Sequence, residues 1–363
     1  MKKNKNYVDL KDQPVPEGQH LLEVDDLKMY FHTEDGVVRA VDGVSYTLDR
    51  GETLGVVGES GSGKSVTAMT IMGLISMPPG KIEGGDVRYR GRSILEMTEE
   101  EMQNIRGNDI AMIFQDPMTS LNPVYKIGKQ VGEGLRLHRG YSKQEALKRA
   151  TELLDLVGIP EPEKRVNEYP HQFSGGMRQR VMIAMALACD PDILIADEPT
   201  TALDVTIQAQ IIELMQEMQE KNGNAIIMIT HDLGVVADMA DKIMVMYAGR
   251  PVEFGTAEEI FYESRHPYTW GLIRSIPEQA IEEKKPLTPI HGNPPSLMNL
   301  PEGCVFSPRC PYATDKCRKQ RPERVVTESG HYSACHYSGD PEFLKNAPET
   351  SRTRKDSKKG GEA

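Results

Sequence analysis

The sequence lacks an apolar run near the length of about 18 residues that a bilayer crossing requires. Its first residues are polar and rich in lysine, and they are not followed by the apolar stretch of a secretory signal. Basic residues are fewer than acidic ones, with 43 Lys and Arg residues against 54 Asp and Glu residues. The net charge is therefore −11. Because nucleic-acid binding needs a basic face, we expect neither DNA nor RNA as the main partner. These absences indicate a globular protein of the cytoplasm.

Cysteine is also scarce. Of the five cysteines, Cys189 stands alone in an apolar segment and is expected to be a small buried residue of the core. The other four fall within the last sixty residues, at Cys304, Cys310, Cys317 and Cys335. Their clustering suggests a separate site near the C-terminal end.

Hydrophobic periodicity predicts an α/β fold with a mostly parallel sheet. Strand-like runs at residues 21–24, 37–41, 44–48 and 53–57 are followed by alternating strand and helix patterns up to about residue 252. Buried strands are expected at 193–196 and 225–229, and helices at 181–187 and 207–221. Residues 117–176 show helical periods with few strand signals, so we expect a helical subdomain there.

Composition divides the chain into four parts. We assign residues 1–18 to a flexible arm and residues 19–262 to the α/β domain. Prolines interrupt regular structure in residues 263–345, which we assign to a C-terminal extension. Residues 346–363 are polar and are expected to form a disordered tail.

The segment 58–65 fits the phosphate-binding pattern G-x-x-x-x-G-K-[ST]. It consists of Gly58, Glu59, Ser60, Gly61, Ser62, Gly63, Lys64 and Ser65. Glycines let backbone N–H groups curl around phosphates, and the expected helix after them presents its positive end to the anion. Lys64 can reach the β- and γ-phosphates, and Ser65 can bind Mg²⁺. An accidental glycine-rich turn is the alternative, but a strand before it and a helix after it argue against that.

Asp197 and Glu198 end the buried strand expected at 193–196. An acid at such a strand end can hold Mg²⁺, and its neighbour can polarise the attacking water. Taken alone, the pair would be better explained as a strand followed by a solvated acidic turn. Together with the phosphate loop, it indicates a nucleotide-hydrolysing site.

Further motifs resemble those of ATP-binding cassette (ABC) ATPases. Residues 173–177 (F-S-G-G-M) are similar to the ABC signature LSGGQ, with Phe in place of Leu and Met in place of Gln. Gln115 resembles the glutamine of the Q-loop, and His231 resembles the switch histidine. The segment 202–204, which ends at Asp204, resembles the D-loop. The resemblance covers about residues 20–260 and implies a P-loop ABC nucleotide-binding domain with a helical subdomain.

The ABC resemblance implies a shared site, with ATP between the phosphate loop of one domain and the signature of a second. The signature residues would then be Ser174, Gly175, Gly176 and Met177. It further implies that Ser65, Gln115 and Asp197 hold Mg²⁺, and that Glu198 activates water. Catalytic roles fall to Glu198, His231, Lys64 and Gln115, while Asp204 joins the nucleotide site. For stacking on adenine we choose Phe31, with Tyr30 as a rival and ordinary strand packing as the alternative.

Three longer segments allow a narrower comparison, namely residues 114–123 (FQDPMTSLNP), 173–180 (FSGGMRQR) and 266–269 (HPYT). They resemble the corresponding segments of the ATPases of bacterial dipeptide and oligopeptide importers. It implies two transmembrane permease subunits, a solute-binding protein and a second, non-identical ATPase, at the cytoplasmic face of the membrane. Nickel or glutathione-like solutes are alternative cargoes, and a soluble ABC ATPase outside transport is an alternative function.

The four clustered cysteines have the spacing C-x5-C-x6-C-x17-C. Disulfides do not suit a cytosolic chain, and structural zinc normally shows tight C-x2–4-C pairs. A zinc site joined by His331 or His336, and four unlinked cysteines, remain alternatives. The peptide-importer resemblance implies a [4Fe–4S] cluster on Cys304, Cys310, Cys317 and Cys335, and hence a small metal-binding C-terminal extension.

Overall fold

The computed structural model describes residues 10, 11, 13–116, 120–200, 205–276 and 289–348. The chain divides into two compact units. Unit 1 contains residues 1–56 and 63–230, and unit 2 contains residues 57–62 and 231–363. Residues 57–62, which include part of the phosphate loop, belong to unit 2. In the described ranges, every helix is too short or too polar to span a bilayer.

Unit 1 contains two sheets. The antiparallel sheet has the order β2-β1-β4-β5, and the other sheet has the order β3-β8-β7-β6 within this unit, with β6, β7 and β8 parallel. All residues of β6, β7 and β8 are buried, as strands covered on both faces must be. The strands of unit 1 are β1 (Leu22–Thr33), β2 (Gly36–Leu48), β3 (Thr53–Val57), β4 (Gly80–Tyr89), β5 (Arg92–Ser93), β6 (Ile110–Ile113), β7 (Ile193–Asp197) and β8 (Ala225–Thr230).

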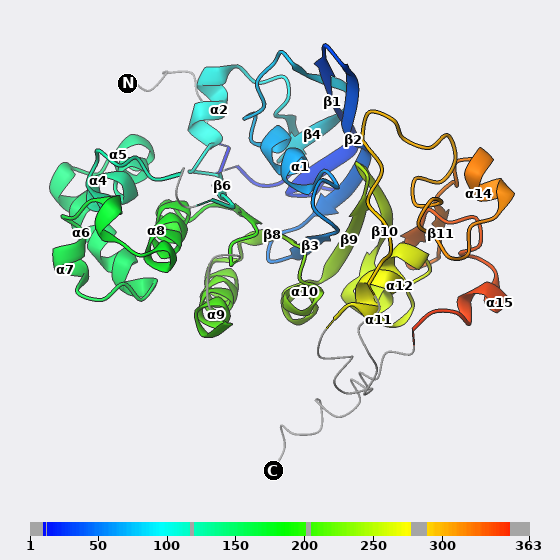
Figure 1. The fold of residues 1–363 in the computed structure, drawn as a ribbon. Coiled ribbons are helices and arrows are strands. Elements are labelled where there is room, and N and C mark those ends of the chain that lie inside the picture. The colour runs from blue at the N-terminus through cyan, green and yellow to red at the C-terminus, as the bar shows by residue number, and fades with distance from the viewer. Residues whose placement is uncertain (1–9, 12, 117–119, 201–204, 277–288, 349–363) are drawn as a thin grey trace. The chain divides into compact units, whose positions relative to one another are not determined.

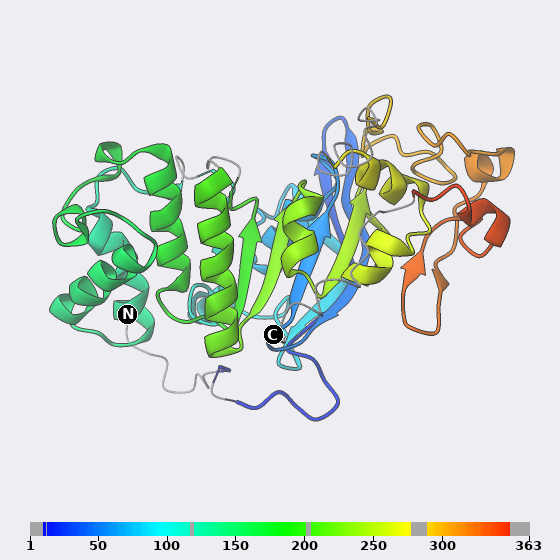
Figure 2. The ribbon, with the colours of Figure 1, turned by 90° about the horizontal axis from the view of Figure 1, so that it is seen from below.

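Helices α4 to α8 form a separate group within unit 1. Figures 1 and 2 show α4 to α8 gathered together, and α4, α6 and α8 contact one another. Helix α6 begins with a capping box in which Ser142 and Glu145 satisfy each other's backbone N–H groups. The helices are α1 (Lys64–Ile71), α2 (Glu99–Ile105), α4 (Ile127–Val131), α5 (Glu133–His138), α6 (Lys143–Leu156), α7 (Pro162–Arg165), the 3-10 helix η1 (Pro170–Gln172), α8 (Gly175–Leu187) and α9 (Val205–Asn222).

The described part of the N-terminal arm contacts other segments of unit 1. Leu10 is only 1% exposed. The Lys11 ammonium donates to the carbonyls of Asn108 (3.3 Å), Cys189 (3.1 Å) and Asp190. Three backbone acceptors on one ammonium hold this part of the arm to loops far along the chain.

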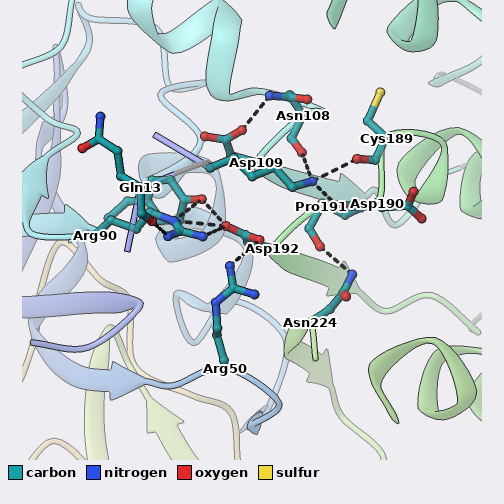
Figure 3. A network of polar contacts seen from close by, with 12 residues as sticks. Gln13, Arg50, Arg90, Asn108, Asp109, Cys189, Asp190, Pro191, Asp192 and Asn224 are labelled. Atoms are coloured by element: carbon teal, nitrogen blue, oxygen red, sulfur yellow. Dashed lines mark hydrogen bonds and ion pairs between the residues drawn. The ribbon is translucent and has the colours of Figure 1, made fainter. Parts of the chain in front are cut away.

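A buried ion pair lies beside these arm contacts (Figure 3). The Arg90 guanidinium lies 2.5 Å from the carboxylate of Asp192, and the two side chains are 3% and 5% exposed. The Tyr89 hydroxyl donates to the same carboxylate at 2.6 Å, and Arg50 donates to its other oxygen at 2.9 Å. Asp192 is therefore fully partnered, which is the condition under which a buried charge is tolerated.

Unit 2 is built on four antiparallel strands in the order β9-β10-β12-β11. A buried pair ties the extension to this sheet, because His331 Nε2 lies 3.0 Å from Glu253 Oε1. Helix α12 starts at the His266-Pro267 motif, where His266 Nδ1 accepts a hydrogen bond from the Tyr268 N–H. The elements are α10 (Leu233–Met239), β9 (Lys242–Tyr247), β10 (Arg250–Thr256), α11 (Ala257–Tyr262), α12 (Pro267–Arg274), α14 (Asp315–Lys319), β11 (Val325–Val326), β12 (Tyr332–Ser333) and α15 (Pro341–Leu344).

Candidate functional site

The phosphate loop leads into α1 through Gly63. Gly63 has φ 100° and stands at the N-cap, and in the described chain no side chain caps this helix end. The first N–H groups of a helix have no partner within the helix, so an uncapped start can receive an anion. Lys64, the first residue of the helix, is buried and supplies positive charge to the same place. The loop and helix therefore have the geometry of a phosphate site.

Gly58 is required by its surroundings within unit 2. It has φ 149°, and a Cβ at this position would lie 2.1 Å from the carbonyl oxygen of Met246. Gly61 has φ 76° with open space around it, so its requirement is conformational. The two glycines thus give the loop its curvature for different physical reasons.

Ser65 and Asp197 meet at the end of β7, as the magnesium prediction requires. Ser65 Oγ donates to Asp197 Oδ1 at 2.9 Å. Burial raises the pKa of the Asp197 carboxyl and nearby Glu198 raises it further, whereas Ser65 and Lys64 act in the opposite direction. A hydroxyl and a carboxylate are oxygen donors of the type that Mg²⁺ prefers, so these residues fit that ion.

Glu198 and Gln115 also lie together in unit 1. Gln115 Nε2 donates to Glu198 Oε2 at 3.0 Å. Glu198 has φ 47°, a left-handed conformation that is costly for a non-glycine residue, and its N–H is held by the Ile229 carbonyl at 2.9 Å. Backbone strain of this kind concentrates at functional sites. The structure therefore brings the predicted acid and the predicted Q-loop glutamine into direct contact.

The signature residues start helix α8, which begins earlier than the helix expected at 181–187. Ser174 is the N-cap, and its Oγ accepts a hydrogen bond from the Met177 N–H at 3.3 Å. Ser174 and Gly175 are exposed. A Cβ added to Gly175 would meet no described heavy atom within 4 Å. The packing of this chain therefore gives no reason for glycine at that position.

The other predicted site residues are the two candidates for adenine stacking, the switch histidine and the D-loop aspartate. Phe31 is half-buried on β1, and the hydroxyl of its rival Tyr30 donates to Asp42 at 2.9 Å. His231 is exposed and directly follows β8. Asp204 lies outside the described residues. The hydrogen bond to Asp42 restrains the Tyr30 ring, so we keep Phe31 as the candidate for stacking on adenine.

A groove of about 570 Å³ opens in unit 1 next to Gln115, and sequence reasoning did not predict it. Phe114, the neighbour of Gln115, lines it and is 38% exposed, and Leu74 is 41% exposed. Four methionines contribute to the lining, at Met72, Met112, Met182 and Met185. Methionine adapts its shape to what it contacts, so such a lining suits a docking surface. The residues come from separate segments, which is why no local pattern indicated the groove.

In unit 2 the four clustered cysteines line one small cavity. All four are free thiols. Burial, together with the neighbouring thiols, raises the pKa of Cys310 to about 11 and that of Cys335 to about 12. As they lie, no three His, Cys, Asp or Glu side chains among the described residues form a metal-ligand group. The prediction that these four cysteines share one place is confirmed, but a metal site is not evident.

The two histidines weighed for a zinc site have other partners. His331 is paired with Glu253, as described above. His336 lines the cysteine cavity, but its Nε2 lies 2.9 Å from the carbonyl oxygen of Gln320. Both contacts argue against the zinc alternative.

Comparison with known proteins identifies the class first. The model of the ABC transporter family matches residues 41–201. Among solved structures, the ATP-binding cassette MJ0796 in its dimeric post-hydrolysis state bound to ADP and Pi gives a TM-score of 0.60 at 29% identity. That alignment covers 65% of this chain and 98% of the other. The fold and the site therefore define an ABC ATPase.

The subgroup within the ABC ATPases is identified by a second family model, which matches the C-terminal part of the chain, and by similar proteins. The model of the oligopeptide/dipeptide transporter C-terminal region matches residues 252–317. The oligopeptide transport ATP-binding protein OppD of Bacillus subtilis is 58% identical, over 86% of this chain and 87% of its own length. The dipeptide transport ATP-binding protein DppD of Escherichia coli is 52% identical, over 88% and 97%. The chain belongs to the family of ATP-binding subunits of oligopeptide and dipeptide ABC transporters, and the resemblance seen in the sequence is confirmed.

Proposed function

We propose that this chain hydrolyses ATP to power the import of dipeptides or oligopeptides through a membrane ABC transporter. The observation that carries the proposal is that four predicted site residues form two contacting pairs in unit 1. Ser65 contacts Asp197, and Gln115 contacts Glu198. Asp197 and Glu198 are consecutive residues, so the two pairs form one connected group at the end of β7.

The proposed chemistry divides among these residues. The backbone of residues 58–65 and the Lys64 ammonium bind the β- and γ-phosphates. Ser65, Asp197 and Gln115 would hold Mg²⁺, which supplies neutralising charge to the phosphates. Glu198 orients water for attack at the γ-phosphorus, and His231 contacts the γ-phosphate. The left-handed backbone of Glu198 fixes where its carboxylate can reach.

A second cassette is needed to complete this site. The open space around Gly175 supports this, because glycine at a helix start costs stability without any gain inside this chain. The close approach of a nucleotide phosphate bound to a second cassette would explain why glycine occupies this position. Ser174 and the N–H groups of Gly175, Gly176 and Met177 would then contact that phosphate. We propose a non-identical ATPase as the partner.

The membrane partners are two transmembrane permease subunits. We propose that a permease segment occupies the methionine-lined groove next to Gln115. Supporting this, Phe114 in the groove wall and Gln115 beside Glu198 are consecutive residues, so an occupant of the groove would act close to the catalytic acid. The chain would then lie at the cytoplasmic face of the membrane, and a solute-binding protein would take part only through the permeases.

We further propose a [4Fe–4S] cluster on Cys304, Cys310, Cys317 and Cys335. Supporting this, all four thiols line one cavity of unit 2, and four cysteine thiolates are the ligands of a [4Fe–4S] cluster. Thiolate ligation would offset the cost of ionising these buried thiols. The cluster would be structural, because a bound metal group adds folding energy to a short segment.

Transport of nickel or glutathione-like solutes, and an ABC function outside transport, are the competing proposals. The deciding experiment is reconstitution of this chain with its permeases, binding protein and second ATPase in vesicles. ATP-dependent uptake of a labelled dipeptide or oligopeptide supports the proposal. Uptake of nickel or glutathione without peptide uptake would contradict the cargo, and ATP hydrolysis unaffected by the permeases would contradict a transport function.

A further inference from the structure

Within unit 2, an arginine from the cysteine-bearing segment is bound to the phosphate loop. Arg309 Nη1 lies 2.5 Å from Glu59 Oε2, and Arg309 Nη2 lies 2.9 Å from Glu59 Oε1. This is a bidentate pair between residues 250 positions apart in the sequence. The Arg309 side chain is 4% exposed and that of Glu59 is 29% exposed, so the guanidinium is buried while water reaches part of the carboxylate. Arg309 immediately precedes Cys310.

All five N–H donors of the guanidinium are used. Besides the two bonds to Glu59, Nε donates to the His291 carbonyl at 3.0 Å and Nη2 donates to the Ile290 carbonyl at 3.2 Å. The fifth donor, on Nη1, reaches the Tyr247 hydroxyl at 3.3 Å. A lysine has three donors on one nitrogen and cannot reproduce this planar arrangement. The position is therefore built for arginine.

A second residue of the extension holds the backbone of the same loop residue. The Glu59 N–H donates to the Tyr268 hydroxyl at 2.8 Å. Tyr268 is fully buried, with its ring 4.6 Å from that of Tyr247 and 5.3 Å from that of Phe306. The Arg309 N–H donates to the Phe306 carbonyl at 3.0 Å. The two residues that bind Glu59 are thus connected, because Tyr268 packs on Phe306 and Arg309 is hydrogen-bonded to the Phe306 carbonyl.

The charge of Glu59 makes this anchoring relevant to nucleotide binding. Glu59 places a carboxylate in a loop whose partner is a polyanion. An unpaired carboxylate there would repel phosphates, and the Arg309 guanidinium neutralises it. The amide of Glu59 is committed to Tyr268, so the loop presents its later N–H groups to the phosphates. Charge and conformation of the loop are therefore both set from the C-terminal extension.

We propose that Arg309 and Tyr268 are positioning residues for the ATP site, so that the C-terminal extension sets the affinity of the phosphate loop for MgATP. The inference rests on the proposed function in one respect, namely that residues 58–65 bind ATP. It goes beyond that function by assigning to the extension a direct part in nucleotide binding.

The test measures equilibrium binding of MgATP to the full chain, together with thermal unfolding without nucleotide. Arg309→Met is expected to raise the dissociation constant about ten-fold, a size typical of coupling between sites. Arg309→Lys is expected to restore only part of the affinity, and higher salt should reduce the defect of Arg309→Met. The matched control is Arg274→Met, an exposed arginine of α12 whose only described hydrogen bond is to the Asn346 carbonyl, and it should bind as wild type.

A double-mutant cycle separates loop positioning from general folding. In the Glu59→Gln background, Arg309→Met should cost much less affinity than in the wild type, because no carboxylate remains to neutralise. An equal loss in both backgrounds, or wild-type affinity of a folded Arg309→Met chain, would overturn the inference. If Arg309→Met does not fold, MgATP binding is measured with Tyr268→Phe instead, because this substitution removes only the hydroxyl. It should weaken MgATP binding several-fold, and unchanged binding would overturn the inference.

The two failures are distinguishable. A wild-type chain that does not bind MgATP would refute the proposed function and this inference with it. A wild-type chain that binds MgATP alongside variants that bind equally well would refute the inference alone.

Discussion

Substitution of Gly175 is expected to affect ATP turnover strongly while leaving the stability of this chain almost unchanged. A Cβ at this position would have no described heavy atom within 4 Å, and Gly175 is the first residue of α8. Replacing glycine by alanine in a helix gains up to about 1 kcal/mol, and less at the first position. Gly175→Ala is therefore expected to change the free energy of unfolding by about 0 to 1 kcal/mol, in the stabilising direction.

The same methyl group should obstruct the close approach of a second cassette's nucleotide. We expect ATP turnover of the assembled transporter to fall by at least about ten-fold, which corresponds to about 1.4 kcal/mol in the barrier. The assay compares thermal unfolding of the isolated chain with ATP turnover of the complex with permeases and second ATPase. Gly339→Ala is the matched control, since Gly339 is also exposed with open space around it, and it should change neither quantity. Full turnover of Gly175→Ala, or a destabilised chain, would refute the reasoning.

Three further predictions concern the loop, the core and the cysteines. Lys64→Ala should weaken MgATP binding, because the buried ammonium at the start of α1 is lost, and equal affinity in a titration would contradict its role. Asp192→Ala should lower the free energy of unfolding by about 3–5 kcal/mol in a denaturant titration, because it leaves Arg90 buried without its partner. A change within about 0.5 kcal/mol would show that the pair contributes little. Anaerobic purification should give about four iron and about four sulfide per chain, both lost in Cys335→Ser, and stoichiometric zinc without iron would reject the cluster.

Local patterns predicted much of the α/β core and of the nucleotide site. The strand expected at 193–196 is observed as Ile193–Asp197, and the strand expected at 225–229 is observed as Ala225–Thr230. Continuous apolar runs and glycine-rich turns are set by nearby residues, so they can be read from short segments. The serine that starts α8 belongs to the same class of local signal.

Long-range features could not be predicted in this way. Strands β1 and β2 form one long hairpin, although the sequence suggested shorter runs, because exposed polar residues on its outer face hide the strand pattern. The pair of Arg309 and Glu59 joins segments 250 residues apart, and neither residue carries a local mark of its partner. The groove lined by Phe114 is likewise assembled from distant segments. Such contacts form only when the folding of one unit brings distant segments of the chain together.

The central claim is that the connected group at the end of β7 performs ATP hydrolysis, with Glu198 as the acid that orients water. The most direct measurement is single-turnover hydrolysis of bound MgATP by the assembled transporter carrying Glu198→Gln. That substitution keeps the size of the side chain and its contact with Gln115 while removing the negative charge. The account predicts that MgATP binds with retained affinity and remains unhydrolysed. Hydrolysis at the wild-type rate would contradict it.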